Sequence, residues 1–413
     1  MAATLFTNIR LLVNTREDNQ LLRGEALAHL PVIKNAYLLV EDGIIAAYGE
    51  MDAMPESFTV VEEIVDAKGQ MILPCWCDSH THLVFAASRE EEFVDKIKGL
   101  SYAEIAAKGG GILNSAQKLN EASESELIRM AWIRIQDLIR MGTGAVEIKS
   151  GYGLSVEGEL KMLRVIKRLK ETSPIPVKAT FLGAHSYPPA YRENHSGYID
   201  LIKNEMLPVI AAEELADYID VFCETGFFSE EETIDICRAG MAYGLIPKIH
   251  ANQLNLSGGV QAGVTLGALS VDHLETMDDA AIRLLAASDT IGTLLPTAAF
   301  FLRMPFQPAR QLIDAGCAIA LASDFNPGSS PSGNMNLVIA MSCIQMKMLP
   351  EEAINAATIN GAFAMGLEDS LGSISAGKKA NLILTKPIPS LAYLPYAFGA
   401  MNIDRVMIAG EWA

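Results

Sequence analysis

The chain has 413 residues, which is too long for one small domain and suits a large α/β domain with a smaller companion. Lys and Arg number 32 against 50 Asp and Glu, a formal net charge of −18. A chain this acidic binds phosphate backbones and anionic membranes poorly, so we expect neither a nucleic acid nor a membrane as partner. The six cysteines are scattered and mostly lie in apolar runs. They indicate buried thiols in a reducing compartment, and we expect a cytoplasmic protein.

Residues 1–68 show short strands and turns. The segments 36–40 and 44–49 are apolar and flank Glu41-Asp42-Gly43, a pattern typical of a β-hairpin. The first thirteen residues alternate like a strand and not like a secretion signal. We therefore assign residues 1–68 to the first part of a small β-domain.

From about residue 69 short apolar runs alternate with amphipathic helices. Ser123 and Glu126, and again Ser229 and Glu232, have the spacing of a helix-capping box. Eight strands are predicted, near 71–79, 144–149, 177–183, 218–223, 246–250, 269–273, 291–295 and 318–323. Eight β–α alternations predict a (β/α)₈ barrel of the TIM type over residues 69–366.

After residue 366 the pattern returns to strands, near 372–374, 380–384 and 405–411. The two ends of the chain resemble each other and flank the barrel. We therefore expect residues 367–413 to join residues 1–68 in one small β-sandwich domain.

The chemically competent residues follow the predicted barrel strands, where TIM barrels carry their active sites. Five of the seven histidines occupy such positions, together with two carboxylates. These residues are His80 and His82 after strand one, His185 after strand three, Glu224 after strand four, His250 after strand five, His273 after strand six and Asp324 after strand eight.

His-x-His on a strand places two imidazoles on one face, where both can reach one ion. Alone, this pattern is a weak signal. Followed in barrel order by His250 and by Ser323-Asp324, it predicts a metal bound by His80, His82, His250 and Asp324. Cys75 and Cys77 are alternative ligands, although the alternation of a strand turns them to the opposite face.

Two stretches carry a family resemblance. Residues 74–82 resemble the Pro-Gly-x-x-Asp-x-His-x-His opening of the amidohydrolase superfamily, and residues 357–382 resemble its C-terminal tract, with Asn381 at the usual Asp. Within that superfamily the chain is similar to the imidazolonepropionases over nearly its whole length. The most specific stretches are 81–89, 108–112, 147–154, 271–275 and 323–328.

The resemblance implies hydrolytic opening of the ring of 4-imidazolone-5-propanoate to N-formimidoyl-L-glutamate, in histidine degradation. It also implies one transition metal, zinc or iron. Asp324 would bind the metal and accept a proton from water, and His273 would be a general base or stabilise the oxyanion. Glu224 stands where binuclear relatives carry a carboxylated lysine, which favours one metal but leaves a glutamate-bridged second metal open.

Gln253 bears on the choice between ring opening and deamination. Deaminases of the superfamily carry a glutamate three residues after the histidine that corresponds to His250, and this carboxyl group transfers a proton to the ring. A glutamine is neutral and does not titrate. Gln253 therefore favours hydrogen bonding to an imidazolone ring.

An anionic substrate needs cations in the pocket of so acidic a chain. Arg89 follows the histidine pair closely, and a guanidinium can bind a carboxylate through two hydrogen bonds. The resemblance implies that Arg89 contacts the propanoate-bearing substrate together with further residues, namely Tyr102, Tyr152, His185, Gln253, Asn326, Gly328 and Ser329.

Two alternatives remain at this point. One is an amidohydrolase acting on another cyclic amide, such as a hydantoin or dihydroorotate. The other is a non-catalytic barrel that serves as an oligomeric scaffold, although such proteins lose metal ligands and all four are present here. Family precedent also implies a homodimer.

Overall fold

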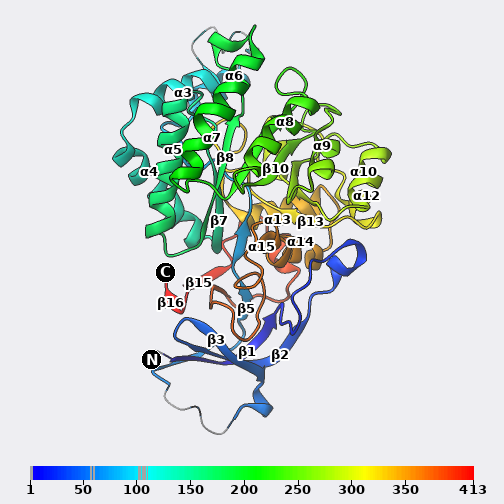
Figure 1. Cartoon of the computed structure of the whole chain (residues 1–413). Coiled ribbons are helices and arrows are strands. Elements are labelled where there is room, and N and C mark those ends of the chain that lie inside the picture. The colour runs from blue at the N-terminus through cyan, green and yellow to red at the C-terminus, as the bar shows by residue number, and fades with distance from the viewer. Residues whose placement is uncertain (1–2, 56–57, 59–60, 101–103, 105–107, 109) are drawn as a thin grey trace.

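The computed structural model of the chain describes residues 3–55, 58, 61–100, 104, 108 and 110–413. A barrel surrounded by helices stands on a smaller β-domain, and both chain ends lie in that smaller domain (Figure 1). Among the described helices, none is both long enough and apolar enough to cross a membrane.

Within the described residues, eight parallel strands form the barrel sheet in the order β6 to β13. They are β6 (Trp76–Asp78), β7 (Thr143–Lys149), β8 (Val177–Ala184), β9 (Tyr218–Cys223), β10 (Ile246–Ala251), β11 (Ser270–His273), β12 (Ile291–Leu294) and β13 (Ile319–Leu321). The segments after the first and last strands meet, since Thr81 and Phe325 form a parallel bridge. The predicted (β/α)₈ barrel is confirmed.

The helices pack around this barrel (Figure 1). Ser123 and Ser229 cap their helices as predicted, and Ser229 with Glu232 forms a complete capping box. The α-helices are α1 (Glu90–Ile97), α3 (Ile112–Glu121), α4 (Glu124–Arg140), α5 (Val156–Thr172), α6 (His195–Leu201), α7 (Leu207–Ala212), α8 (Glu230–Met241), α9 (Gly259–Leu266), α10 (Asp279–Ala286), α11 (Pro296–Leu302), α12 (Ala309–Asp314), α13 (Met335–Ile344), α14 (Pro350–Ala357), α15 (Ile359–Phe363) and α16 (Tyr393–Tyr396).

The smaller domain is a sheet built from both chain ends, as predicted. Its strands are β1 (Ala3–Val13), β2 (Val32–Glu41), β3 (Ile44–Glu50), β4 (Glu63–Asp66), β5 (Met71–Pro74), β14 (Leu382–Thr385), β15 (Ile403–Ile408) and β16 (Glu411–Trp412). The hairpin turn between β2 and β3 has positive φ at Asp42 and Gly43, 49° and 79°. A core of its own fills the domain, with Phe6, Leu38 and Leu382 among its buried side chains.

One predicted strand is wrong in its extent. The segment 71–79 is not a single barrel strand, because β5 pairs with β1 and β14 in the smaller sheet and only β6 pairs with β7. Both halves are fully buried, so burial pattern alone does not separate them. The crossing takes place at Cys75, directly before the residues that lead to the histidine pair.

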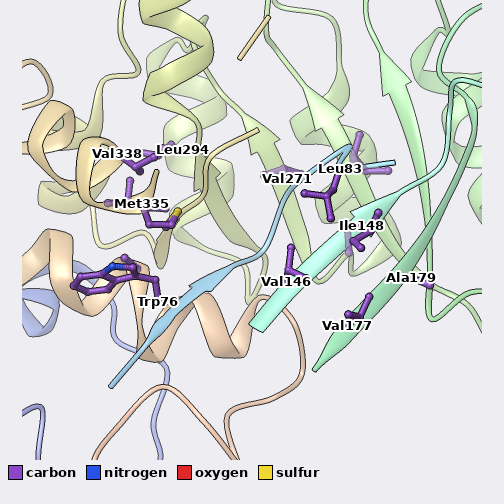
Figure 2. Close-up of a cluster of buried hydrophobic side chains, with 14 of the residues drawn as sticks. Trp76, Leu83, Val146, Ile148, Val177, Ala179, Val271, Leu294, Met335 and Val338 are labelled. Atoms are coloured by element: carbon purple, nitrogen blue, oxygen red, sulfur yellow. The ribbon is translucent and has the colours of Figure 1, made fainter. Parts of the chain in front are cut away.

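The main core lies between the barrel strands and the helices. Figure 2 shows part of it, with Trp76, Val146 and Val177 on neighbouring strands and with Leu83 and Met335 in the same cluster. The barrel strands are covered by helices on the outside and by other side chains on the inside. Their sequences are therefore nearly continuous apolar runs. The polar side chains that interrupt those runs therefore lie inside the barrel or at its end.

Asn360 ties three parts of the chain together below the barrel. Its Nδ2 donates to the carbonyl oxygens of Leu22 and Ile319, each at 2.8 Å, and its Oδ1 accepts from Leu22 N at 3.0 Å. The side chain is fully buried. The amide therefore satisfies backbone groups that have no access to water.

We predict that Asn360→Ala lowers the free energy of unfolding by about 2–4 kcal/mol, because it leaves buried backbone groups unpaired. Denaturant unfolding followed by circular dichroism measures the change. Gln117→Ala is the control, since the side chain of Gln117 bonds only Glu121 among the described residues and does so from an exposed position. Equal losses of stability in the two variants would contradict the assigned role of Asn360.

Candidate functional site

Three imidazoles and one carboxylate converge where the barrel closes. His80 and His82 follow β6, His250 lies on β10 and Asp324 follows β13. His250 Nε2 lies 3.4 Å from His82 Nε2, and Asp324 Oδ1 lies 3.5 Å from His80 Nε2 and 3.6 Å from His82 Nε2. All four side chains are buried.

These distances fit a metal ion. Four ligand atoms about 2.1 Å from one ion at tetrahedral angles lie about 3.4 Å from each other. His80 Nε2 is buried and has no hydrogen-bond partner. An unpartnered nitrogen in this position is costly unless it binds something, so the donor set suits a transition metal that accepts nitrogen and oxygen ligands.

Two carboxylates orient the imidazoles. Asp272 Oδ2 lies 2.7 Å from His80 Nδ1, and Asp220 Oδ2 lies 2.8 Å from His250 Nδ1. A histidine that donates through Nδ1 presents the lone pair of Nε2 to the centre of the cluster. The two carboxylates therefore fix the tautomer that metal binding requires.

A buried lysine joins these two carboxylates. Lys149 Nζ lies 2.9 Å from Asp220, 3.6 Å from Asp272 and 2.6 Å from Glu147. Burial alone would lower the pKa of Lys149, but Asp220 and the other carboxylates raise it above its ordinary value. The lysine is therefore a cation beneath the cluster.

The protonation states of the three histidines suit metal binding. Burial, reinforced by neighbouring cations and imidazoles, lowers the pKa of His80, His82 and His250 well below the ordinary value. These imidazoles are therefore neutral at pH 7, as metal ligands must be. Burial raises the pKa of Asp324 to about 7, opposed mainly by His273.

His273 lies beside the cluster. Its ring centroid is 5.2 Å from that of His250 and 5.6 Å from that of His80. Its Nδ1 lies 3.4 Å from Glu275 Oε1, which also accepts from Gln307 Nε2 at 3.0 Å. Burial would lower the pKa of His273, but the carboxylates of Glu275 and Asp324 raise it overall.

The backbone is strained at this end of the barrel. His273 has φ 91° and Asp324 has φ 51°. Such angles are uncommon outside glycine and are retained where the surrounding structure enforces them, often at functional sites.

Glu224 does not join the cluster. Its two oxygens accept hydrogen bonds from Thr225 N at 2.7 Å, Leu254 N at 2.8 Å and Asn255 Nδ2 at 3.0 Å. The carboxylate thus fastens the loop after β10. A bridging role between two metals would require it to give up these bonds.

A cavity of about 390 Å³ opens above the cluster. Arg89 lines it, donates through Nε to Ser115 Oγ at 2.8 Å and lies 5.9 Å from the Tyr152 ring centroid. Most of the predicted substrate-binding residues line the same cavity, namely Tyr152, His185, Gln253, Asn326, Gly328 and Ser329. Tyr102 lies outside the described residues.

Tyr152 and His185 form one wall of the cavity. Their ring centroids are 5.6 Å apart, and the His185 ring is stacked on that of His82 at 5.3 Å. His185 Nδ1 lies 3.0 Å from the Gly151 carbonyl oxygen, and burial lowers the pKa of His185 to about 4. His185 is therefore neutral and keeps Nε2 as an acceptor.

The loop after β13 is arranged around Asn326. Its Oδ1 accepts from Gly328 N and Ser329 N, both at 2.8 Å, and its Nδ2 donates to Asp324 O at 2.6 Å. Ser329 Oγ lies 3.3 Å from Asp324 Oδ2. Asn326 therefore shapes the loop, and Ser329 helps to hold the predicted metal ligand.

Several residues of the site were not identified from the sequence. They are the buried carboxylates and cations below and around the cluster, namely Asp220, Asp272, Lys149 and Glu275, and Glu159, which accepts from the backbone of Gly151, Gly153 and Leu154. Asp220 and Asp272 could have been found from the sequence, because each is a charged residue within an otherwise apolar strand.

Comparison with known proteins agrees with this geometry. Residues 71–413 match the sequence model of the amidohydrolase family. An imidazolonepropionase of Flavobacterium johnsoniae is 58% identical over 409 residues, covering 99% of either chain. One from Thermoanaerobacter pseudethanolicus is 40% identical, covering 93% of this chain and 91% of the relative.

Solved structures show the same fold at low identity. The guanine deaminase of E. coli has a TM-score of 0.73 at 14% identity, covering 100% of this chain and 99% of the other. The 5-methylcytosine deaminase of Klebsiella pneumoniae has a TM-score of 0.73 at 17% identity, covering 99% and 97%. With the full-length relatives above, the barrel and its cluster lead to one conclusion: the chain belongs to the amidohydrolase family and, within it, to the imidazolonepropionases.

Proposed function

We propose that this chain opens the ring of 4-imidazolone-5-propanoate by hydrolysis and forms N-formimidoyl-L-glutamate. Water adds to the ring carbonyl carbon, the carbon–nitrogen bond of the amide breaks, and the departing nitrogen takes a proton. The observation that carries the proposal is the cavity itself, which holds a metal-type donor cluster at its base and the Arg89 guanidinium on its wall.

We propose one zinc or iron ion as the cofactor, with His80, His82, His250 and Asp324 as its ligands. The convergence of these four side chains supports the assignment, as does the engagement of Glu224 elsewhere. When bound at such a centre, the metal supplies an activated hydrolytic water near neutral pH.

Asp324 and His273 are the proposed proton carriers. Asp324 lies at the base of the cavity, within 3.6 Å of the Nε2 atoms of His80 and His82, where its carboxylate would accept a proton from the hydrolytic water. His273 stands beside it with Glu275 behind its Nδ1, an arrangement that keeps Nε2 available to the carbonyl oxygen or to the incoming water.

The remaining cavity residues are proposed to bind the substrate. Arg89 would pair with the propanoate, while Tyr152, His185 and Gln253 would contact the ring. Gln253 is neutral and lines the cavity beside His250, which supports ring binding over deamination. Asn326, Gly328 and Ser329 would contact substrate or product through the loop after β13. Another cyclic amide, such as a hydantoin, is not favoured, because relatives named imidazolonepropionase match the whole chain.

We also propose a cytoplasmic homodimer. The free thiols of all six cysteines support a reducing compartment.

The dimer is supported by an exposed apolar surface. Tyr396 and Phe398, exposed by 78% and 67%, offer this surface for association. Light scattering of the purified chain should give the mass of two subunits, and the mass of one would contradict the dimer.

The direct test of the activity is a ring-opening assay with freshly generated 4-imidazolone-5-propanoate. Guanine and hydantoin propionate serve as controls. We expect turnover of the imidazolone and little of either control. Turnover of guanine without turnover of the imidazolone would overturn the proposed function.

Gly328 provides a test of the proposed carboxylate site. A Cβ at this position would lie 2.6 Å from Arg89 Nη1, and the backbone there is not in the left-handed region. We predict that Gly328→Ala displaces the guanidinium and raises KM about tenfold, because a bidentate ion pair depends on its geometry.

A double-mutant cycle separates this effect from a general disturbance of the loop. If alanine acts through Arg89, adding Gly328→Ala to Arg89→Ala should change KM little. An equal effect of Gly328→Ala in both backgrounds would refute the steric explanation.

A further inference from the structure

The substrate cavity has a second cation that the assignment above does not use. Lys96, on α1, lines the same cavity as Arg89, His250 and Asp324. Its side chain is exposed at the rim, whereas the metal-type cluster is buried at the base. The cavity therefore runs from three of the proposed metal ligands, His82, His250 and Asp324, to two positive charges.

Arg89 has no carboxylate partner. Its Nε is bonded to Ser115 Oγ, an uncharged hydroxyl, and no described carboxylate oxygen lies within 4.0 Å of the guanidinium. In a chain of net charge −18, and directly before Glu90, Glu91 and Glu92, a cation without an ion pair is unexpected. The terminal nitrogens of Arg89 remain available for an anionic ligand.

Lys96 is also without an ion pair among the described residues. The usual partner on a helix lies four residues earlier, which here is Glu92. Glu92 Oε1 instead accepts from Gly111 N at 2.8 Å. Asp95, the adjacent carboxylate, pairs with Lys108 at 3.1 Å. Both nearby acidic groups of α1 are thus engaged elsewhere, and the ammonium group of Lys96 is left to the cavity.

The electrostatics of the rim agree with a site for an anion. Desolvation lowers the pKa of Lys96, Glu92 opposes this shift, and Arg89 adds to it by repulsion. A lysine on an exposed helix is usually only solvated. Lys96 differs, since it shares a cavity with a second cation and Glu92 compensates only part of the hydration that it loses there.

We propose that Lys96 is a specificity-determining residue which, together with Arg89, binds the carboxylate of the substrate at the mouth of the cavity. The proposal rests on the proposed ring opening, and it extends the assignment of the carboxylate site from one cation to two. Arg89 gives directed hydrogen bonds, and Lys96 adds a mobile charge that attracts the acid. The pair selects cyclic amides that carry a carboxylate side chain over neutral rings.

Steady-state kinetics of Lys96→Met test this role, because methionine keeps much of the apolar stem without the charge. With 4-imidazolone-5-propanoate we expect KM to rise about two- to fivefold, the range for an ion pair at a solvent-exposed rim, while kcat stays nearly unchanged. Lys96→Arg should restore KM. With a methyl-substituted imidazolone that lacks the carboxylate, Lys96→Met and the unaltered chain should behave alike.

Lys98→Met is the matched control, since Lys98 is exposed at the end of the same helix and does not line this cavity. It should leave KM unchanged. An unchanged KM in Lys96→Met would overturn the proposal. So would equal losses of kcat with the acidic and the neutral ring, which indicate a structural role.

The proposal can fail independently of the proposed function. If the unaltered chain does not open the imidazolone, the reaction assignment is wrong. Calorimetric binding of imidazole-4-propanoate to the metal-loaded protein then still tests Lys96. Binding weakened about twofold or more by Lys96→Met supports the carboxylate site, and equal binding contradicts it.

Discussion

The site depends on one buried ionic contact, the ammonium group of Lys149 between Asp220 and Asp272. Two carboxylates this deep inside a barrel would repel each other and lose their hydration without a cation between them. With Lys149 in place, each can accept from an imidazole, Asp220 from His250 and Asp272 from His80. The ammonium group of Lys149 thus balances the charge of two carboxylates, and these carboxylates orient two of the predicted metal ligands.

The contacts that close the barrel lie beside the same proposed ligands. His82 N donates to Phe325 O at 2.9 Å, and Asp324 N donates to His80 O at 3.0 Å. Asp78 joins the same two segments through Ser323 N at 2.9 Å. The first and last barrel segments supply three of the four proposed ligands, so forming the last strand contact also assembles the cluster. The unusual φ angle of Asp324 persists because these contacts hold the segment on both sides of it.

Much of this arrangement was predictable from the sequence, since strand alternation and barrel order bring His80, His82, His250 and Asp324 to one end of the barrel. The division of 71–79 between two sheets was not, because both halves are mostly apolar and both are fully buried. Asp220 and Asp272 were visible as polar residues in buried strands, but periodicity does not reveal which cation they meet. Gly328 was predicted from the resemblance to contact the substrate. That its amide bonds Asn326 and that its missing Cβ leaves room for Arg89 are tertiary contacts, which the sequence does not show. The role of Lys96 depends on where Glu92 is engaged, which is a tertiary contact.

The central claim is that four convergent side chains hold a single metal ion. Anomalous diffraction from crystals of the metal-replete protein, recorded at the zinc and iron absorption edges, tests it most directly. The account predicts one peak per chain, bonded to the Nε2 atoms of His80, His82 and His250 and to a carboxylate oxygen of Asp324. Two peaks bridged by Glu224, or a peak at Cys75 and Cys77, would contradict it.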